Sequence, residues 1–533
     1  MATRYAVATG NWSNTATWDG GTLPTSSDDV YANNKTVTID QDVTVLSLRN
    51  NAVASPVIAA GGTFQSQTSG TRIVNANVIS TTNGSVVTIV AGIVNFTLNG
   101  AITAGTNANS TFTMGTYTYV DANLTSYPTV TINGNITSGS VSSSEGVRHG
   151  GGRLYVTGTV TGGSGGTSNY GINAFNSNNI PTYTEIKTGS SLVGGTSSSG
   201  STAALAVTWT PTGTSIAPSS TVINCNLTGG ASGSGGSGNA AYNHVTNSIP
   251  CTITGNVTGT LANRAINISS SADLTINGHV YAASTGAGGS QSEAAVIHNG
   301  AGQLTINGNL YGSTFAGAVQ SGCVYLQSSG AKYTQTGDII GGNSTSGNFC
   351  LWSGNAGQTI VVNGNITGGL SGSSSSWGYR SNNTSALTVN GNVTGGAGTQ
   401  AYGIANETTA TVTINGTVTA GTGSTSHGIN ANSNGVIIAT KLKGNDGGPG
   451  SVGINGSGYA VSSNNLSGII RFKQLEFGAL GNTPINGLGS YQIIDDAANN
   501  TAFQCRQAKE TIYSLYRRHC STEQTKPTET ATI

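Results

Sequence analysis

The stretch Thr129–Gly139, which reads TVTINGNITSG, decides the fold because the chain repeats it. Close copies lie at Leu274–Ala283, Leu304–Gly312, Ile360–Gly369, Leu387–Gly396 and Thr411–Gly421. Weaker copies lie at Phe96–Gly105, Leu154–Gly163, Val222–Gly230, Cys251–Gly259 and Tyr333–Gly342. A period of a few tens of residues indicates a solenoid, a propeller or a repeat array, and it has to be interpreted before any other feature.

Each copy contains an anchor position that is usually glycine. The clearest anchors are Gly134, Gly278, Gly308, Gly364, Gly391 and Gly416, and weaker ones are Gly100, Gly158, Gly189, Cys225, Gly255 and Gly337. Successive anchors lie 23 to 36 residues apart. A propeller blade needs roughly 40 residues or more, whereas a solenoid accepts loops whose length varies from turn to turn. The spacing therefore favours a solenoid.

The repeat alternates apolar and polar residues. In Thr129–Thr137, the side chains of Val130, Ile132 and Ile136 fall on one face, and polar residues fall on the other. A period of two indicates half-buried strands. Gly134 interrupts the apolar face, and a glycine inside a strand pattern marks a bend or a close approach of two backbones. The phrase therefore predicts two short strands joined at a corner.

A second column of small residues, each usually followed by an apolar one, predicts a third strand in every turn. The pairs are Gly171-Ile172, Ala265-Ile266, Ala295-Val296, Cys323-Val324, Cys350-Leu351, Gly378-Tyr379, Gly403-Ile404, Gly428-Ile429 and Gly453-Ile454. Three strands in about 25–30 residues predict an all-β fold, a single-stranded parallel β-helix (β-solenoid), with a rod of about twelve coils over residues 61–460. Stacked antiparallel hairpins are the alternative, and they fit the unequal loops less well.

Composition limits the partners that the chain can attract. Of 533 residues, 80 are glycine and only 7% are charged, and the formal net charge is zero. Such a chain has no long-range attraction for nucleic acid or for an anionic membrane. The rod surface is expected to consist of Thr, Ser, Asn and Gly. It suits hydrogen bonding to neutral polar groups such as sugars, and it equally suits an inert, soluble surface.

Targeting segments and cysteine spacing add little. No apolar stretch suggests a secretory signal or approaches the roughly 20 residues of a membrane span, so we expect no membrane insertion. The six cysteines form neither a CxxC motif nor a zinc spacing. Cys323 and Cys350 share the small-residue column, where we expect two buried thiols rather than a disulfide.

The two ends differ from the rod. Trp12 and Trp18 lie within residues 1–60, which we expect to form a small N-terminal cap over the first coil. Residues 461–520 predict a last strand and a C-terminal amphipathic helix, with a possible capping box at Thr501 and Gln504. Its apolar face would comprise Cys505, Ala508, Ile512, Leu515 and His519, and its basic face Arg506, Lys509, Arg517 and Arg518. Residues 521–533 predict a flexible tail.

The opening of the chain resembles the N-terminal region of bacteriophage tail fibres, tailspikes and other virion structural proteins. The residues that carry the resemblance are Tyr5, Gly10, Asn11, Trp12, Thr17, Trp18, Pro24, Thr25, Ser26, Asp28, Asp29, Val30, Val37, Thr38, Ile39 and Asp40. The resemblance covers about forty residues, and related openings precede β-helices of bacterial surface proteins as well. It implies a virion-attached, homotrimeric rod whose N-terminal region docks on other virion proteins and which meets a host surface glycan or protein. It carries over no functional residue.

An enzymatic alternative is a tailspike that cleaves polysaccharide. Glycoside hydrolysis needs two carboxylates about 5–10 Å apart. The acids of the rod are Asp121, Glu145, Glu185, Asp273, Glu293, Asp338 and Glu407, and the repeat brings no two of them together within one chain, which leaves a site between subunits.

One group of charges within the rod is dense enough to compare with a lyase site. Glu145, Arg148, His149 and Arg153 are close in sequence, and a solvated loop is the favoured interpretation of this group. His244, His279, His298 and His427 are expected at the surface or in loops.

These observations favour a non-enzymatic virion structural protein that mediates attachment to the host. A depolymerase with an inter-subunit site and a bacterial surface adhesin are the alternatives. We expect no catalytic residue within one chain, no cofactor and no metal, because no phosphate-binding or calcium motif is present.

Overall fold

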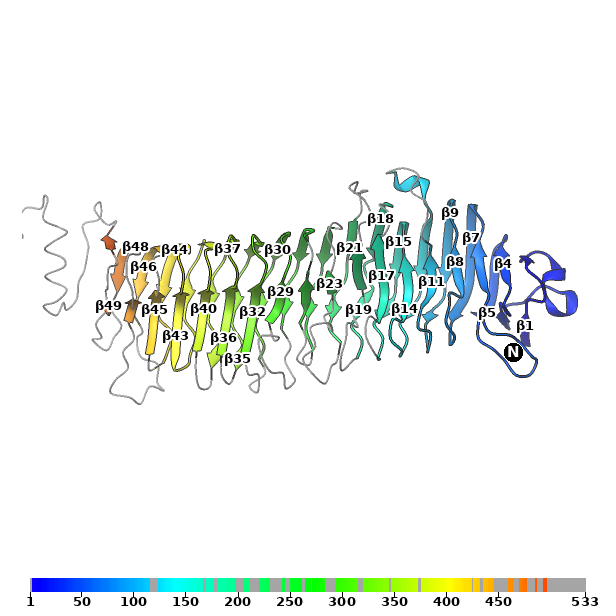
Figure 1. The fold of residues 1–533 in the computed structure, drawn as a ribbon, viewed down its shortest axis with the longest axis horizontal. Coiled ribbons are helices and arrows are strands. Elements are labelled where there is room, and N and C mark those ends of the chain that lie inside the picture. The colour runs from blue at the N-terminus through cyan, green and yellow to red at the C-terminus, as the bar shows by residue number, and fades with distance from the viewer. Residues whose placement is uncertain are drawn as a thin grey trace, which may run out of the picture.

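A computed structural model shows a long rod built from stacked turns of strand (Figure 1). It describes residues 2–115, 123–165, 169–176, 180–196, 205–209, 220–230, 242–244, 250–260, 264–269, 271–282, 294–314, 320–344, 347–371, 375–423, 425–431, 435–444, 459–463, 469–476, 485–486 and 492–495. The predicted all-β parallel β-solenoid is confirmed, with about 13 turns. The hypothesis of stacked antiparallel hairpins is wrong, because the strands of successive turns pair in parallel.

The first sheet contains 30 strands and takes two walls of every turn. The quoted stretch forms β12 (Thr129–Asn133) and β13 (Ile136–Thr137), separated by the predicted corner at Gly134. Ile132 pairs in register with Leu98 of the preceding turn and with Val156 of the following turn. Because most of the pairing keeps one register from turn to turn, similar side chains stack in columns along the rod.

The longer strands of this sheet are β1 (Ala2–Tyr5), β3 (Asp28–Tyr31), β5 (Val43–Arg49), β7 (Ser69–Ile79), β9 (Ile93–Asn99), β15 (Gly152–Thr157), β18 (Thr182–Ile186), β21 (Ser220–Ile223), β24 (Cys251–Thr254), β27 (Leu274–Asn277), β30 (Gln303–Asn307), β33 (Lys332–Thr336), β37 (Thr359–Asn363), β41 (Ala386–Val389), β44 (Thr411–Thr419), β46 (Val436–Lys443), β48 (Ile469–Glu476) and β50 (Gln492–Asp495). The short strands after the corner are β10 (Ile102–Thr103), β16 (Thr159–Thr161), β19 (Ser191–Val193), β22 (Leu227–Thr228), β25 (Val257–Thr258), β28 (Val280–Tyr281), β31 (Leu310–Tyr311), β34 (Ile339–Ile340), β38 (Ile366–Thr367) and β42 (Val393–Thr394).

The second sheet supplies the third wall. Its strands are β2 (Gly10–Asn11), β4 (Thr36–Ile39), β6 (Thr63–Ser66), β8 (Val87–Ile89), β11 (Ser110–Met114), β14 (Glu145–His149), β17 (Tyr170–Asn176), β20 (Leu205–Trp209), β23 (Tyr242–His244), β26 (Ile266–Ile268), β29 (Ala294–His298), β32 (Gln320–Leu326), β36 (Gly347–Ser353), β40 (Ser375–Ser381), β43 (Gln400–Asn406), β45 (Thr425–Ala431), β47 (Tyr459–Ser463) and β49 (Ile485–Asn486). Single-turn 3₁₀ helices lie at η1 (Thr15–Thr17), η2 (Asp19–Gly21) and η3 (Leu124–Ser126), and β35 (Asn343–Ser344) pairs with β39 (Leu370–Ser371).

The column of small residues runs along a bend inside this third wall. The ladder between β32 and β36 pairs Gly322 with Phe349 and Val324 with Leu351, and it skips Cys323 and Cys350 between them. At the bend the small side chain turns inward, and the Cys323 thiol donates to the Ile340 carbonyl oxygen at 3.2 Å. The opposite wall is therefore too close for a larger residue, as the sequence pattern indicates.

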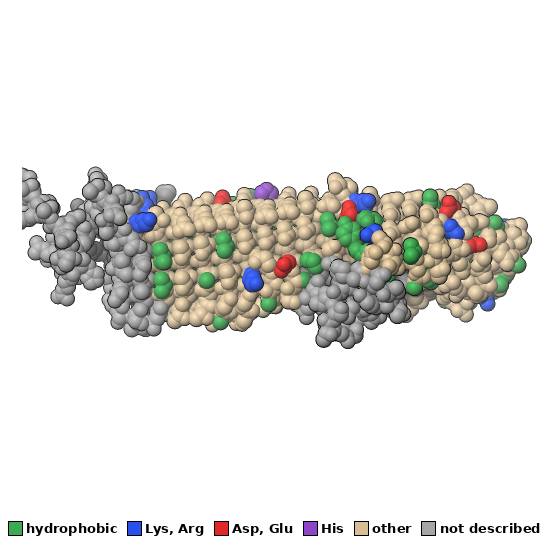
Figure 2. All heavy atoms as spheres, turned by 90° about the horizontal axis from the view of Figure 1, so that it is seen from above, with side chains coloured by type: hydrophobic (Ala, Val, Ile, Leu, Met, Phe, Trp, Pro, Cys, Tyr) green, Lys and Arg blue, Asp and Glu red, His purple; other side chains and the backbone are tan. Residues whose placement is uncertain are grey.

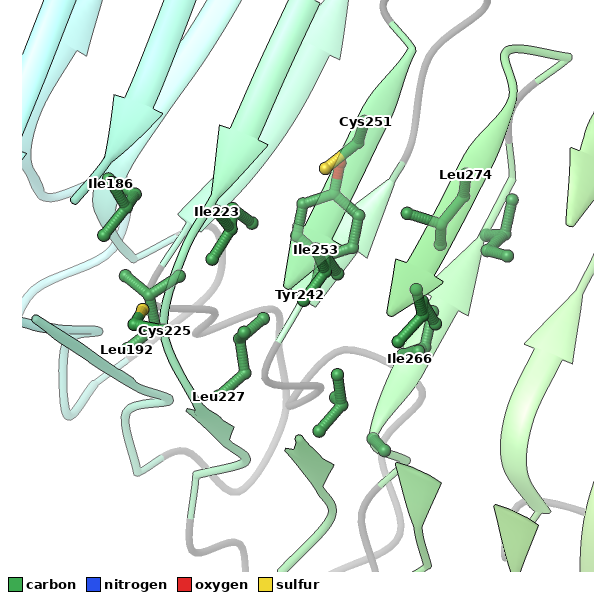
Figure 3. Packing of buried hydrophobic residues seen from close by; sticks show 14 of the residues in the cluster. Ile186, Leu192, Ile223, Cys225, Leu227, Tyr242, Cys251, Ile253, Ile266 and Leu274 are labelled. Carbon is green, nitrogen blue, oxygen red and sulfur yellow. The ribbon is translucent and has the colours of Figure 1, made fainter. Parts of the chain in front are cut away.

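One continuous apolar core fills the space between the walls from one end of the described rod to the other. Figure 3 shows Ile223, Leu227 and Ile253 pointing into it from strands of neighbouring turns. Each turn thus contributes a few Val, Ile or Leu side chains and covers those of its neighbours. This arrangement explains how a chain so rich in glycine and serine can be folded.

The residue type at each position of the recurring Asn-Gly-Asn corner has its own physical cause. The side-chain amide of Asn133 donates to the side-chain oxygen of Asn99 at 2.9 Å. A methyl group on Gly134 would lie 2.2 Å from the carbonyl oxygen of Gly100, so only glycine fits. The side chain of Asn135 accepts the backbone N–H of Thr159 at 3.0 Å. The corner therefore consists of two polar side-chain columns with a glycine column between them.

The anchor of another turn shows when glycine can be replaced. Cys225 occupies an anchor position, and the turn before it has two additional residues between its strands, because Ile186 and Leu192 pair with Ile223 and Leu227. In other turns, the anchor residue lies against the backbone of the anchor in the preceding turn. We infer that the wider corner around Gly189 moves this backbone away from Cys225. A side chain at Cys225 is therefore accommodated.

Two tryptophans close the N-terminal end. Trp12 and Trp18 are buried, their ring centroids lie 4.7 Å apart, and the Trp18 indole N–H donates to the Trp12 carbonyl oxygen at 2.9 Å. Trp12 also packs on Phe64 of the third wall. The strands within residues 1–60 belong to the same two sheets as the rod, so this cap is the first part of the solenoid. The C-terminal helix and tail lie outside the described residues.

Candidate functional site

The charge cluster in the sequence at Glu145–Arg153 is divided between two walls of the rod. Glu145 and His149 belong to β14 and are buried, whereas Arg153 belongs to β15 on the first wall. The favoured interpretation as a solvated loop is therefore wrong. That interpretation fails because β14 bends at Gly146, and the bend turns the residues on either side of Gly146 toward different surroundings.

His149 is a structural residue at the corner between β14 and β15. Its Nδ1 lies 2.9 Å from the Thr184 hydroxyl, and its Nε2 lies 3.2 Å from the Gly152 carbonyl oxygen. Burial lowers the pKa of the His149 imidazole to about 4. Neutral and fully enclosed, this imidazole has no free nitrogen for proton transfer to a substrate.

Two more histidines differ from their expected surface or loop positions. His298 ends β29 and is buried, with its Nε2 at 2.9 Å from the Gly302 carbonyl oxygen. His427 lies in β45 and is also buried, stacked on Tyr402 with 5.0 Å between ring centroids. Burial lowers the pKa of both imidazoles. In the repeat, His149 and His298 occupy equivalent places, and that register was the signal that sequence reasoning missed.

His279 lies in the corner column rather than in a site. Its Nδ1 accepts the backbone N–H of Asn309 at 2.9 Å, as the Asn side chains of other turns do at this place. His244 lies in β23.

The described carboxylates of the rod are engaged in structural contacts. Glu145 accepts from Asn173 at 2.6 Å and Glu185 accepts from the Tyr183 hydroxyl at 2.8 Å, while Glu407 pairs with Arg380 at 3.2 Å.

Two further carboxylates accept backbone N–H groups of the following turn. Asp273 bonds the N–H of Gln303 and Asp338 bonds the N–H of Asn365. Asp121 and Glu293 lie outside the described residues. Within the described part, strand pairing places no two of these acids opposite each other.

The cysteines of the rod are free thiols. Cys225, Cys251, Cys323 and Cys350 are buried and unbridged, so the expectation of buried thiols at Cys323 and Cys350 is confirmed. Burial raises the pKa of Cys225 to about 11 and that of Cys251 to about 12, which disfavours the reactive thiolate. Figure 3 shows the Cys251 sulfur beside the Tyr242 ring. Cys505 and Cys520 lie outside the described residues.

Among the described residues, no three His, Cys, Asp or Glu side chains come together in a way that could hold a metal ion. No described helix has the length and apolar character that crossing a membrane requires.

From β21 to β44 the long strands of the first wall contain one charged residue, Lys332. Figure 2 shows a surface made mostly of uncharged polar side chains and backbone, with isolated charged groups. One column consists mainly of threonine, including Thr275, Thr305 and Thr388, and the next consists largely of asparagine, including Asn307 and Asn390. These side chains provide hydroxyl and amide groups at regular intervals along the rod.

A mixed patch interrupts this wall near one third of the chain. Arg153 and Tyr155 of β15 stand in register with Tyr183 and Glu185 of β18, and the Lys187 ammonium lies 4.8 Å from the centroid of the Tyr155 ring. Burial and the bonded Glu185 carboxylate raise the pKa of Tyr183 to about 12. Arg153 therefore lies in a partly exposed aromatic and charged patch, not in a catalytic cluster with His149.

A larger aromatic cluster on the third wall was not foreseen. Trp352 stacks on Tyr325 with 4.4 Å between centroids, and the Arg380 guanidinium lies 4.9 Å from the Trp352 ring and 4.6 Å from the Trp377 ring. These residues belong to two outward columns, and within each strand the two column positions are three residues apart. The signal in the sequence was the recurrence of aromatic residues at this spacing. Because the rings contact one another and Arg380 across turns, the cluster stabilises the wall.

A shallow groove of about 700 Å³ runs across several turns, just after the short strands that follow the Asn-Gly corner. Threonine, serine and glycine residues make up most of its lining, and its described lining residues carry no charge. The residues include Thr137, Thr161, Val193, Gly229 and Thr260. The described lining holds no titratable side chain that could perform acid–base chemistry.

Comparison with known proteins adds no assignment. No protein family, no curated protein and no solved structure matches this chain.

Proposed function

We propose that this chain is a non-enzymatic structural rod of a bacteriophage virion, similar to a tail fibre or tailspike, that attaches the particle to the host cell surface. The observation that carries the proposal is the long, charge-poor wall of registered hydroxyl and amide side chains. Such a wall can contact many neutral polar groups along its length. The described acids are held by structural bonds, which favours adhesion over cleavage.

The N-terminal end supplies the proposed attachment to other virion proteins. Of the large hydrophobic side chains that are exposed in the described part, Val7, Val57, Ile73 and Ile93 lie near this end, and Leu370 lies far along the rod. Val57 is 84% exposed. The concentration of exposed apolar side chains within residues 7–93 supports the N-terminal part of the rod as the docking end. The resemblance of the chain's opening to virion proteins supports this end as the attachment end. It also supports a homotrimeric assembly.

The test has two parts, applied to the full-length chain. Antibodies against the rod should label intact phage particles, and the Val57→Asp variant should fold but be incorporated at least about tenfold less often than wild type, because a buried charge disfavours an interface. Labelling of bacterial envelopes in the absence of phage, with none on particles, would support an adhesin instead. Analytical ultracentrifugation gives the mass of the assembly and tests the trimer.

The second part separates binding from cleavage. Purified rod should bind bacterial cells and lose binding when surface glycans or surface proteins are stripped, which identifies the class of receptor. It should release no new sugar ends from the glycan. Release of such ends by the wild-type oligomer would replace the proposal with a depolymerase whose site lies between subunits.

A further inference from the structure

The exposed Asn-Gly pairs of the corners carry a chemical liability that the fold controls. Asn99, Asn133, Asn307, Asn390 and Asn415 are all solvent-exposed, and each precedes a glycine. Asn-Gly is the dipeptide in which the backbone nitrogen of the second residue attacks the side-chain amide most readily, because glycine has no side chain to obstruct it. Water and base therefore reach each of these side-chain amides. Only the local geometry protects each amide from attack by the backbone nitrogen.

The geometry holds the two reacting groups toward opposite neighbours. The Gly134 backbone N–H donates to the Thr157 carbonyl oxygen of the following turn at 2.9 Å. The Asn133 side-chain amide donates to Asn99 of the preceding turn at 2.9 Å. The attacking nitrogen and the attacked carbon can meet only when both bonds break, that is, when neighbouring turns separate at this corner.

We propose that the corner asparagines are modification sites that react when stacked turns open, and that the reaction prevents those turns from closing again. The Gly134 nitrogen loses its proton and forms a bond to Cγ of Asn133, while the Cγ–Nδ2 bond breaks and ammonia leaves with a proton. Water then opens the succinimide to aspartate or isoaspartate. The overall change consumes one water and releases one ammonia, with no oxidation or reduction.

Two consequences at the corner make the step irreversible. The new carboxylate has no N–H to donate, so at Asn133 it would face the side-chain oxygen of Asn99 without a bond. Isoaspartate also adds a methylene group to the backbone, at a corner where one methyl group on Gly134 would already lie 2.2 Å from the Gly100 carbonyl oxygen. The modified corner thus lacks both the polar partner and the space that the stack requires.

Peptide mapping by mass spectrometry tests the first half of the proposal. The full-length protein is incubated at mildly alkaline pH, folded in one sample and in denaturant in another. We expect each corner asparagine to react at least about tenfold more slowly in the folded sample, because reaction there requires local opening. Rates that agree within about twofold between the two samples would overturn the proposal.

The chain provides its own matched control. Threonine occupies the place of Asn133 in other turns, at Thr157 and Thr336. Asn133→Thr should therefore fold, lose modification at this corner and leave the other corners unchanged. Asn133→Asp mimics the product, and we expect its backbone amides around Gly134 to exchange hydrogen at least about tenfold faster than those of Asn133→Thr. Equal exchange in the two variants would contradict the claim that the modified turns cannot close.

Discussion

The side-chain nitrogen of Asn390 lies 2.7 Å from the side-chain oxygen of Asn363, although the two residues are 27 positions apart in the chain. Asn415 donates in the same way to Asn390 at 2.8 Å. A residue in the middle of such a ladder makes two of these bonds, whereas a residue at its end makes one. The ladder therefore couples consecutive turns through exposed polar side chains.

The number of ladder bonds predicts the cost of removing each asparagine. Asn390→Ala should lower the free energy of unfolding of the surrounding turns by roughly 1 kcal/mol, and Asn415→Ala by about half as much, since exposed hydrogen bonds contribute modestly. Hydrogen exchange of the β37, β41 and β44 amides measures both. Equal losses in the two variants would show that the bonds do not contribute separately.

A methyl group at an anchor glycine should be far more damaging. In Gly364→Ala the added carbon would lie 2.2 Å from the Gly337 carbonyl oxygen, so two turns must separate. We expect a loss of about 3 kcal/mol, at the upper end of the cost of overpacking. Cys225→Ala is the control, because its corner already accepts a side chain, and it should cost less than about 1.5 kcal/mol. Thermal unfolding followed by circular dichroism compares them, and a Gly364→Ala protein as stable as Cys225→Ala would contradict the explanation.

The buried histidines predict a loss of stability in acid. His149 has its folded-state pKa lowered to about 4, below the value near 6.5 of an unfolded chain. The unfolded chain then binds the proton first, so stability is complete above about pH 6.5 and falls as the pH drops from there toward 4. For His149 alone the difference over this window is about 3 kcal/mol. His427, also lowered to about 4, acts in the same direction.

A substitution isolates the contribution of His149. His149→Asn removes the titrating ring, and the variant should lose stability at neutral pH while showing a shallower decline between pH 6.5 and 4. The measurement is the denaturation midpoint as a function of pH, compared with wild type. Parallel pH profiles for the two proteins would show that His149 is not the group that titrates.

The sequence predicted the fold because the backbone corner requires specific residues. Glycine at Gly134 and its equivalents has a steric cause, and alternation around residues such as Ile132 follows from burial of one strand face. A repeat of these features in register leaves few architectures. The antiparallel alternative could not be rejected from the sequence, because alternation is the same in both directions of pairing.

Side chains outside that pattern were harder to place. Proximity in sequence suggested a cluster of Glu145, His149 and Arg153, but the bend in β14 and the corner before β15 send them to different surroundings. The outward aromatic columns escaped notice since Trp352 and Arg380 come from different turns, and their contact depends on the length of the loop between them. Neighbours across turns become visible only when every turn is aligned.

Closure of the N-terminal end gives the last prediction. Trp18→Ala removes a buried ring that packs on Trp12, and truncation of a buried aromatic residue costs about 3–5 kcal/mol. In a solenoid each turn contacts only its neighbours, so the loss should be confined to the first turns. We expect faster hydrogen exchange in β1, β3 and β5 and unchanged exchange in β37 and β41. Trp18→Phe, which keeps a ring but loses the bond to the Trp12 carbonyl oxygen, should cost about 1–2 kcal/mol. Uniformly faster exchange along the rod in Trp18→Ala would mean that the turns unfold together, against a nearest-neighbour description.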